Sequence, residues 1–500
     1  MSANIILSIS YHCIYFLEHS TSAVNSKIKL LAALILPAVV YTAYAITAEG
    51  VLDSGDGIKH YQIARFSWNH PELLLDHWGK PLFTLLSSPF AQFGFKGVMV
   101  FNIILGLLAA YFTFKSARKL NLPYPKTAII FVCFAPVYFH TVLGGLTEVL
   151  FSFMLALCIW LCLQSRFVFA AVVLSFMPFS RAEAWLVMPF FGLYFVLKKE
   201  YKIIPLMTVG FLLYSFIGWF HYDDFLWVIN ENPYAKAHGA YGSGELFYFF
   251  KSYKSILGNP LLFVFLTGCV VMCYLIFVKK ENAWINEQLL LIAAPAFAVL
   301  LAHSYFWWMG LYGSFGLTRV IGMVIPCFIL LGMYGLYVLK WLPLKKKWLE
   351  YALLLAIVWL VVRFAFDVKR FPFRLNLKQQ LLAETAEWFK TTEFTNERIY
   401  YLHPFLGYLL DVDPFDPEKS TLVWSMDKQN PETNVPSNAI VFWDAIFCPL
   451  EGKLPLNALM ESNSYELLKS FKPEHEIRFY DTLKFEVYVF RRKAVDEIVQ

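Results

Sequence analysis

Long apolar stretches separated by short polar segments fill the first 366 residues of the chain. A helix that crosses the hydrocarbon core of a bilayer needs about 20 residues. The pattern predicts eleven spans, near residues 30–48, 97–114, 127–143, 148–164, 167–179, 185–197, 203–219, 260–278, 288–303, 320–339 and 349–366. We therefore expect an α-helical polytopic membrane protein, with its membrane domain over residues 1–366 and an interfacial helix before the first span.

The pattern changes at Asp367, after which no apolar stretch is long enough to span a bilayer. Segments with helix-like and strand-like periodicity alternate there, which predicts a small soluble α/β domain over residues 367–500. Its expected elements are helices at 379–389 and 464–471 and strands at 397–402, 437–444 and 484–492.

Composition supports the membrane assignment, since 58% of the residues are hydrophobic and only 16% are charged. Soluble proteins have about a quarter charged residues. The net charge of +5 does not indicate nucleic-acid binding, because Lys and Arg cluster in the loops between spans. These clusters fall in every second loop, which predicts a cytoplasmic N-terminus and an extracytoplasmic first loop (49–96) and C-terminal domain. We expect a multi-pass protein of the inner (plasma) membrane, surrounded by membrane lipids. Eight cysteines, seven of them in apolar or near-terminal segments, predict neither a disulfide framework nor a zinc site.

The run from Asp53 to Pro81 in the first loop concentrates carboxylates, cations and histidines at the membrane surface. An ionised carboxylate can accept the proton of a hydroxyl group that attacks an electrophile. Asp56 is the first candidate for this base and Asp53 the second. His60 and Tyr61 follow in a helix expected directly after Asp56, so Asp56 could instead cap that helix. The run could also hold a divalent cation, although no cofactor is required by the pattern, or it could be a solvated loop.

Two cations, Lys80 and Arg319, each lie at the beginning of an apolar segment on the same predicted side. A fixed cation at that depth can bind a phosphate group and stabilise negative charge that develops on it. Snorkelling of the side chain to the membrane surface is the alternative explanation.

Further ionisable residues lie at or within the outer membrane boundary, where a charge is costly unless it is paired or faces a polar cavity. Arg181 and Glu183 could form a structural ion pair or contact a substrate, and Glu148 and His303 are candidates for the same substrate contacts. The loop 220–259 contains Tyr, His, Asp and Gly residues, which is typical of a mobile cover.

Five motifs follow one another along the chain, in the order DGIKHYQIAR, GKPLF, TEVLFSFMLAL, SRAEAWLVMP and GLTRVIGMVIP. In this order, and followed by an extracytoplasmic α/β domain, they resemble the GT-C superfamily of integral membrane glycosyltransferases, which includes dolichyl-phosphate-mannose-dependent mannosyltransferases. The resemblance implies transfer of a sugar, with inversion, from a polyprenyl-phosphate donor to an acceptor hydroxyl on a glycan, lipid or protein.

The resemblance also implies roles for single residues. Asp56 would be the base, Lys80 and Arg319 would contact the carrier phosphate, and the loop 220–259 would cover the acceptor. Many relatives have an Asp-Glu pair followed closely by an aromatic residue, whereas the acids here are Asp53 and Asp56, so the choice between them stays open. Two other interpretations also stay open: a transporter or flippase of lipid-linked glycans, and an oligosaccharyltransferase or polymerase that moves a whole glycan.

Overall fold

The computed structural model describes residues 27–28, 30–233, 241–280, 284–344, 346–368, 373–474, 476–479 and 483–494. The interfacial helix expected before the first span and part of the expected cover loop lie outside these residues. Contacts between residues divide the chain into two units. The helical unit comprises Met1–Ala43, Asn102–Val142 and Glu148–Arg370, and the mixed unit comprises Tyr44–Phe101, Leu143–Thr147 and Phe371–Gln500.

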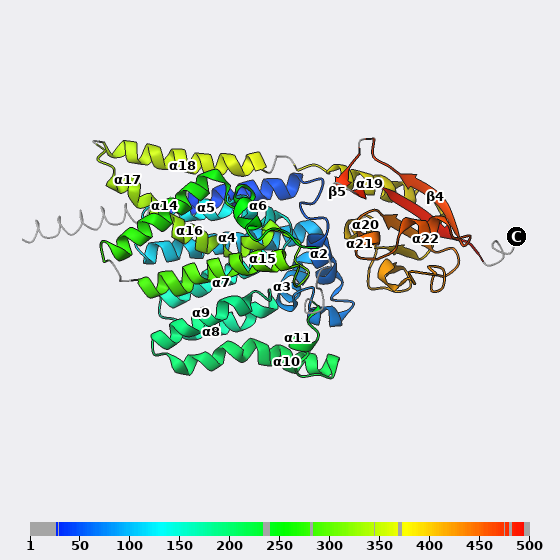
Figure 1. Ribbon diagram of the computed structural model, residues 1–500, viewed down its shortest axis with the longest axis horizontal. Coiled ribbons are helices and arrows are strands. Elements are labelled where there is room, and N and C mark those ends of the chain that lie inside the picture. The colour runs from blue at the N-terminus through cyan, green and yellow to red at the C-terminus, as the bar shows by residue number, and fades with distance from the viewer. Residues whose placement is uncertain are drawn as a thin grey trace, which may run out of the picture. The chain divides into compact units, whose positions relative to one another are not determined.

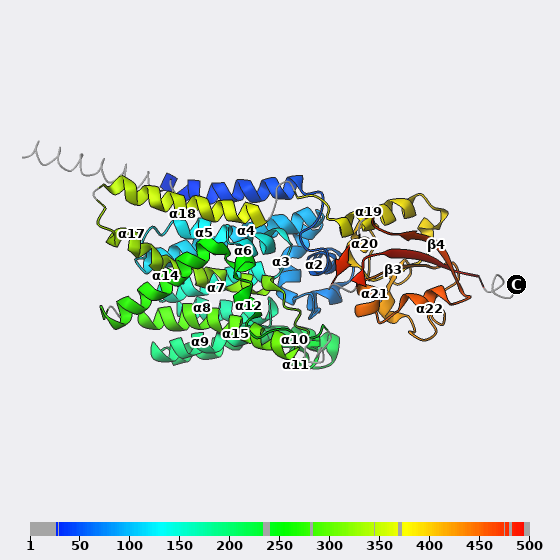
Figure 2. The same cartoon turned by 45° about the horizontal axis from the view of Figure 1, so that its top comes forward.

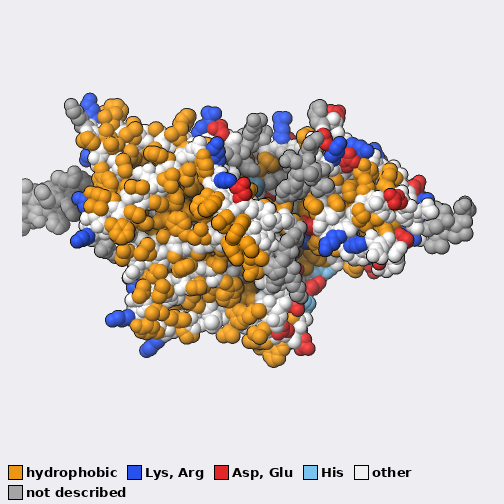
Figure 3. All heavy atoms as spheres, in the orientation of Figure 1, with side chains coloured by type: hydrophobic (Ala, Val, Ile, Leu, Met, Phe, Trp, Pro, Cys, Tyr) orange, Lys and Arg blue, Asp and Glu red, His pale blue; other side chains and the backbone are white. Residues whose placement is uncertain are grey.

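Seven of the described helices are long and apolar enough to cross a membrane. They are Leu30–Thr47, Phe95–Lys119, Tyr201–Tyr222, Gly258–Phe277, Glu287–Met309, Thr318–Trp341 and Lys347–Asp367. The first of these and α18 (Lys347–Val368) lie side by side in both ribbon views (Figures 1 and 2). Hydrophobic side chains cover the visible face of the helical unit (Figure 3), as a surface in contact with lipid requires.

The remaining apolar segments depart from the expected eleven spans. Residues 127–143 were expected to form one span, but they form two helices, α5 (Thr127–Cys133) and α6 (Pro136–Leu143). Pro136 has no N–H group to continue the ladder, and the Tyr41 hydroxyl donates to the Cys133 carbonyl that the next turn would use. The helix α6 then meets α7 (Glu148–Leu163) at 118°, so these two count at most as one bent span.

Two further expected spans are shorter helices. They are α8 (Phe167–Phe176) with the 3₁₀ turn η2 (Met177–Phe179), and α9 (Ala184–Leu197). One other span is the single helix α14 (Gly258–Phe277). Three further spans are each made of consecutive elements: η3 (Tyr201–Thr208) with α10 (Val209–Tyr222); η5 (Glu287–Ala293) with α15 (Ala294–Met309); and η6 (Thr318–Val324), α16 (Ile325–Gly332), η7 (Met333–Leu336) and α17 (Tyr337–Trp341). The short helices α11 (Trp227–Asn230), α12 (Tyr248–Lys251) and α13 (Tyr253–Ile256) lie between spans.

The mixed unit contains a five-stranded sheet with strand order β2-β1-β3-β7-β4. Its strands are β1 (Ile399–Tyr401), β2 (Ser420–Leu422), β3 (Ile440–Asp444), β4 (Tyr465–Phe471) and β7 (Val487–Arg492). The strands β2, β1 and β3 are parallel, while β7 is antiparallel to β3 and β4. A small hairpin joins β5 (Arg478–Phe479) and β6 (Leu483–Lys484). All five residues of β3 are buried, as expected for a central strand covered on both faces.

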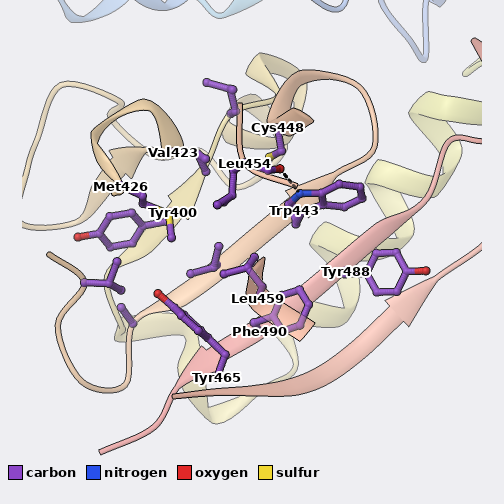
Figure 4. Close-up of a cluster of buried hydrophobic side chains, with 14 of the residues drawn as sticks. Tyr400, Val423, Met426, Trp443, Cys448, Leu454, Leu459, Tyr465, Tyr488 and Phe490 are labelled. Atoms are coloured by element: carbon purple, nitrogen blue, oxygen red, sulfur yellow. Dashed lines mark hydrogen bonds between the residues drawn. The ribbon is translucent and has the colours of Figure 1, made fainter. Parts of the chain in front are cut away.

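One face of this sheet packs against α19 (Leu377–Lys390), with the Phe389 ring 5.1 Å from the Phe442 ring. The other side has a cluster of buried hydrophobic side chains that includes Tyr400, Trp443 and Phe490 (Figure 4). The Trp443 indole N–H donates to the Leu454 carbonyl at 2.9 Å, which satisfies this cluster's buried indole. Short helices complete the C-terminal part: α20 (Pro404–Leu409), α21 (Phe447–Leu450) and α22 (Leu456–Met460).

The helix predicted at residues 464–471 is wrong, because this segment forms the strand β4. Its partner β7 explains the outcome: Glu466 lies directly opposite Arg491, and their side chains form an ion pair at 3.0 Å. Cross-strand pairing of this kind depends on tertiary contacts and outweighs local propensity. The other four elements expected after residue 367 are present.

The first loop forms three helices in the mixed unit, α2 (Asp56–Phe66), the 3₁₀ helix η1 (Pro71–Leu75) and α3 (Pro81–Ala91). An ion pair and a hydrogen bond join it to C-terminal residues of the same unit. Arg65 lies 2.7 Å from Asp411, and His70 lies 2.9 Å from Asp413. The first loop and the C-terminal domain therefore share one network of contacts.

Candidate functional sites

The two candidate bases lie at the N-terminal end of α2. The Gly57 N–H donates to Asp53 Oδ1 at 2.9 Å, so Asp53 satisfies a backbone donor of the first turn. This corrects the sequence-based alternative, which gave the capping role to Asp56. Asp56 is instead the first residue of the helix, where the helix dipole favours an ionised carboxylate. A Cβ at Gly57 would clash with the Gly144 carbonyl oxygen, so glycine is needed to bring the two segments together.

His60 and Tyr61, expected to contact substrate, are both buried in α2. The His60 ring stacks on Trp78 with ring centres 4.6 Å apart. The Tyr61 hydroxyl accepts a hydrogen bond from Arg65 at 2.9 Å, and its ring edge packs against Tyr408. These contacts give both side chains a packing role, and a substrate contact stays a prediction for each.

Lys59 is a residue that sequence reasoning missed. Its side chain is partly buried, and its ammonium lies 4.9 Å from the centre of the Phe415 ring. Burial lowers the pKa of Lys59 to about 8, although the nearby Asp76 carboxylate opposes this effect. The only signal in the sequence was its position between Asp56 and His60, which does not reveal burial.

Lys80 lies at the N-terminal end of α3 with a positive φ of 64°, which is strained for a residue other than glycine. Its side chain is buried, and Nζ donates to the His77 carbonyl at 3.2 Å. The turn before it is held by hydrogen bonds from the Gly79 N–H to Asp76 and from the Thr84 hydroxyl to the Gly79 carbonyl. The ammonium group of Lys80 is therefore fixed by a rigid turn and does not behave as a snorkelling side chain.

Five other candidate residues meet inside the helical unit, and we call them the Arg–Glu cluster: Glu148, Arg181, Glu183, His303 and Arg319. Glu148, at the start of α7, is 1% exposed. One of its carboxylate oxygens lies 3.0 Å from Arg181 Nη1 and 3.9 Å from Arg319 Nε. The ion pair that the sequence allowed between Arg181 and Glu183 is present at 2.7 Å.

Glu183 also reaches His303, with 3.2 Å between a carboxylate oxygen and Nε2. Two arginines and two glutamates therefore nearly neutralise one another in the Arg–Glu cluster. A buried charge is tolerated only with such partners. The cluster places the Arg319 guanidinium next to the buried Glu148 carboxylate, with 3.9 Å between Nε and the nearest carboxylate oxygen.

The described part of the expected cover loop contacts the end of α15. The Gly244 N–H donates to the Trp307 carbonyl at 3.0 Å, and the Tyr241 ring lies 4.7 Å from the Phe315 ring. Tyr234 and His238 of this loop lie outside the described residues.

Within the described ranges, no three or more His, Cys, Asp and Glu side chains group so that they could hold a metal ion.

No protein-family model matches this chain, and no curated protein matches its sequence. Solved structures are similar in fold. The apo structure of ArnT from Cupriavidus metallidurans has a TM-score of 0.56 at 13% identity, over 93% of this chain and 98% of that one. ArnT bound to undecaprenyl phosphate gives 0.54 at 11% identity, over 92% and 98%.

An oligosaccharyltransferase from Archaeoglobus fulgidus, tethered with an acceptor peptide containing the NVT sequon, has a TM-score of 0.50 at 10% identity. The match covers 89% of this chain and 79% of that one. At these identities the likeness concerns the fold. The chain shares the fold of the ArnT structures and of the oligosaccharyltransferase structure.

Proposed function

We propose that this protein is an integral membrane glycosyltransferase that moves a sugar from a polyprenyl-phosphate donor to an acceptor hydroxyl on the extracytoplasmic side. The observation that carries the proposal is the extent of the fold similarity. It covers 92% of this chain and 98% of an ArnT structure that holds undecaprenyl phosphate. The similarity thus includes both the spans and the C-terminal residues, and it supports the same class of lipid carrier.

In the proposed reaction the acceptor oxygen attacks the anomeric carbon of the sugar. Asp56 takes the proton of the hydroxyl group as the new C–O bond forms. The bond between the sugar and the phosphate breaks, its electron pair stays on the phosphate oxygen, and the anomeric carbon is inverted. Asp53 is the weaker candidate for this role, because its carboxylate already accepts the Gly57 N–H.

Lys80 and Arg319 are proposed to contact the carrier phosphate. Negative charge increases on this phosphate as the sugar leaves, so a fixed cation stabilises the transition state more than the ground state. Lys80, in its strained and hydrogen-bonded turn, and Arg319, which lies 3.9 Å from Glu148, are the two cations that we propose for this role.

The test uses the purified full chain in detergent with a panel of polyprenyl-phosphate sugars, and mass spectrometry follows consumption of each donor. We expect Asp56→Asn to lower transfer by at least 100-fold, since general bases contribute about 10²- to 10⁴-fold, while donor binding is kept. Asp53→Asn is the matched control, because it is the same change in the same turn. Equal loss in both variants, or full activity in Asp56→Asn, would contradict the assignment of Asp56.

The fold of the archaeal oligosaccharyltransferase favours one second candidate, transfer of a whole glycan. Donors that carry one sugar and donors that carry several sugars separate the two reactions in the same assay. If no donor is consumed and the Asp variants bind the carrier like the wild type, the enzyme proposal fails. Transport of glycolipid in liposomes is then the activity to measure.

A further inference from the structure

A cavity of about 420 Å³ in the helical unit lies apart from every residue discussed so far. It is lined by three cations near the end of α4 (Phe95–Lys119), namely Lys115, Arg118 and Lys119. Trp160, near the end of α7, and Trp284, just before η5, line it as well. The cavity, which we call the basic cavity, therefore lies where three apolar segments begin or end, at the depth where a membrane meets water.

The described residues supply no carboxylate counter-ion to the cations of the basic cavity. In the described parts of the chain, no carboxylate forms an ion pair with Lys115, Arg118 or Lys119. Lys115 lies 5.6 Å from the centre of the Trp160 ring instead, and Lys119 lies 5.9 Å from that of Trp284. The C-terminal ends of α4 and α7 each contribute about half a negative charge. About two positive charges remain unbalanced.

One residue that lines the cavity also carries a hydrogen-bond donor without a partner among the described residues. The indole Nε1 of Trp160 is buried and has no hydrogen-bond partner among the described residues. A buried N–H group without a partner is costly, so a partner from outside the chain would stabilise this arrangement. An anion with several oxygen atoms satisfies both the cations and this donor.

The outer surface of α4 indicates where such an anion comes from. Ile104 and Leu108 are exposed and lie one helical turn apart. On the same side of the helix, Lys115 follows Leu108 after about two turns and Lys119 follows Lys115 after one more. An acyl chain that follows this stripe brings its headgroup to the basic cavity.

We propose that the basic cavity binds the phosphate-bearing headgroup of an anionic membrane lipid, with the phosphodiester between the three cations and the two indoles. Clusters of Lys and Arg at the ends of spans also occur as topology signals alone. A topology signal requires only charge on one side of the membrane, whereas here the cations converge on a cavity with indoles and lack carboxylates. Basic pockets between membrane helices bind anionic headgroups in this way.

The test is native mass spectrometry of the full chain in detergent, titrated with phosphatidylglycerol and, separately, with phosphatidylcholine. We expect phosphatidylglycerol to bind at least tenfold more tightly. The variant Arg118→Gln/Lys119→Gln should weaken its binding about 20- to 30-fold, at about fivefold for each charge removed. The control Lys279→Gln/Lys280→Gln removes the same charge from exposed residues on the same predicted side and should bind like the wild type.

Trp160→Phe keeps the ring and removes only the N–H group, so it tests the site even if the charge variant does not fold. We expect at least a fivefold loss of phosphatidylglycerol binding. Equal binding of both lipids, or equal loss in the control variant, would overturn the proposal. Displacement of the lipid by millimolar inorganic phosphate would show a site for free phosphate and would overturn the lipid assignment.

Discussion

Replacing Glu148 by Gln tests whether the Arg–Glu cluster holds the helical unit together. The substitution keeps the shape of the side chain and removes its charge, and Glu148 is 1% exposed. Arg181 and Arg319, from two other segments, both lose their nearest shared carboxylate. Two positive charges then remain in a buried site, with Glu183 as the carboxylate that still forms an ion pair with Arg181 among the described residues.

The distances give the size of the effect. At an effective dielectric constant of about 20, the contacts of 3.0 Å and 3.9 Å correspond to attractions of about 5 and 4 kcal/mol. Part of the lost attraction is offset, because burying the neutral amide of glutamine costs less free energy than burying a carboxylate. Loss of one partner from a buried ion pair costs about 3 to 5 kcal/mol in other proteins. We expect Glu148→Gln to lower the free energy of unfolding by about 3 kcal/mol.

Thermal unfolding of the purified full chain in detergent, at a fixed heating rate, measures this effect. For a unit of this size, about 3 kcal/mol lowers the unfolding midpoint by roughly 5 to 10 °C. The matched control is Glu245→Gln, the same change in an exposed ion pair with Lys251. Exposed pairs contribute little, so the midpoint of this control should not move.

The double variant Glu148→Gln/Arg181→Gln separates pairing from simple loss of packing. If the cost arises from an uncompensated arginine, removal of that arginine restores part of the midpoint. A midpoint for Glu148→Gln equal to those of the wild type and Glu245→Gln would refute the reasoning. So would a double variant whose loss equals the sum of the two single losses.

Two further predictions follow from pKa shifts in the mixed unit. Because burial lowers the pKa of Lys59 to about 8, we expect its acetylation by acetic anhydride to reach half of its plateau near pH 8; a half-plateau near pH 10.4, the ordinary pKa of lysine, in peptide mass spectrometry would contradict this. Burial, and secondarily Lys378, lowers the pKa of His403 to about 3, so the unfolded chain takes up a proton below about pH 6.5 while the folded chain does not. Between pH 7 and pH 5 the free energy of unfolding of the wild type should therefore fall by about 2 kcal/mol, whereas that of His403→Asn should not show this fall. Hydrogen exchange of peptides from β3 and β7 measures both proteins, and equal losses in the two would refute the prediction.

The sequence predicted well those elements whose pattern reflects their surroundings directly. Apolar spans face lipid or other apolar helices, and the buried run at 440–444 and the alternating run at 487–492 belong to a sheet. The prediction failed for β4, because the spacing of apolar residues in YELLKSF is compatible with a helix and with a strand. Pairing with β7 determines that the segment is a strand. The break at residues 134–135 was visible as Pro136, but the use of the Cys133 carbonyl by Tyr41 was not.

The candidate sites show the same division. Chemical type and side of the membrane were enough to choose Glu148, Arg181, Glu183, His303 and Arg319. These five residues form one cluster because segments up to 171 residues apart in the sequence pack together. The periodicity of the sequence does not show which distant segments pack together. The Gly57 N–H that Asp53 accepts lies where Gly57 closely approaches Gly144, 87 residues further along the chain, and the local pattern does not reveal this approach either.

Two groups of cations in the helical unit differ in how they can bind an anion. In the Arg–Glu cluster, carboxylates offset the charge of the arginines. An anion would therefore bind there through hydrogen bonds from the arginine N–H groups and not through attraction to a net charge. In the basic cavity no described carboxylate offsets the cations, so net charge itself attracts the ligand. At 0.1 M salt, attractions between exposed charges fall off over about 10 Å. Salt weakens the attraction between buried charges far less. Lipid binding at the basic cavity should therefore weaken as the salt concentration rises, while the destabilisation caused by Glu148→Gln should persist. This contrast separates a site that attracts its ligand by net charge from one that holds its side chains in a fixed geometry.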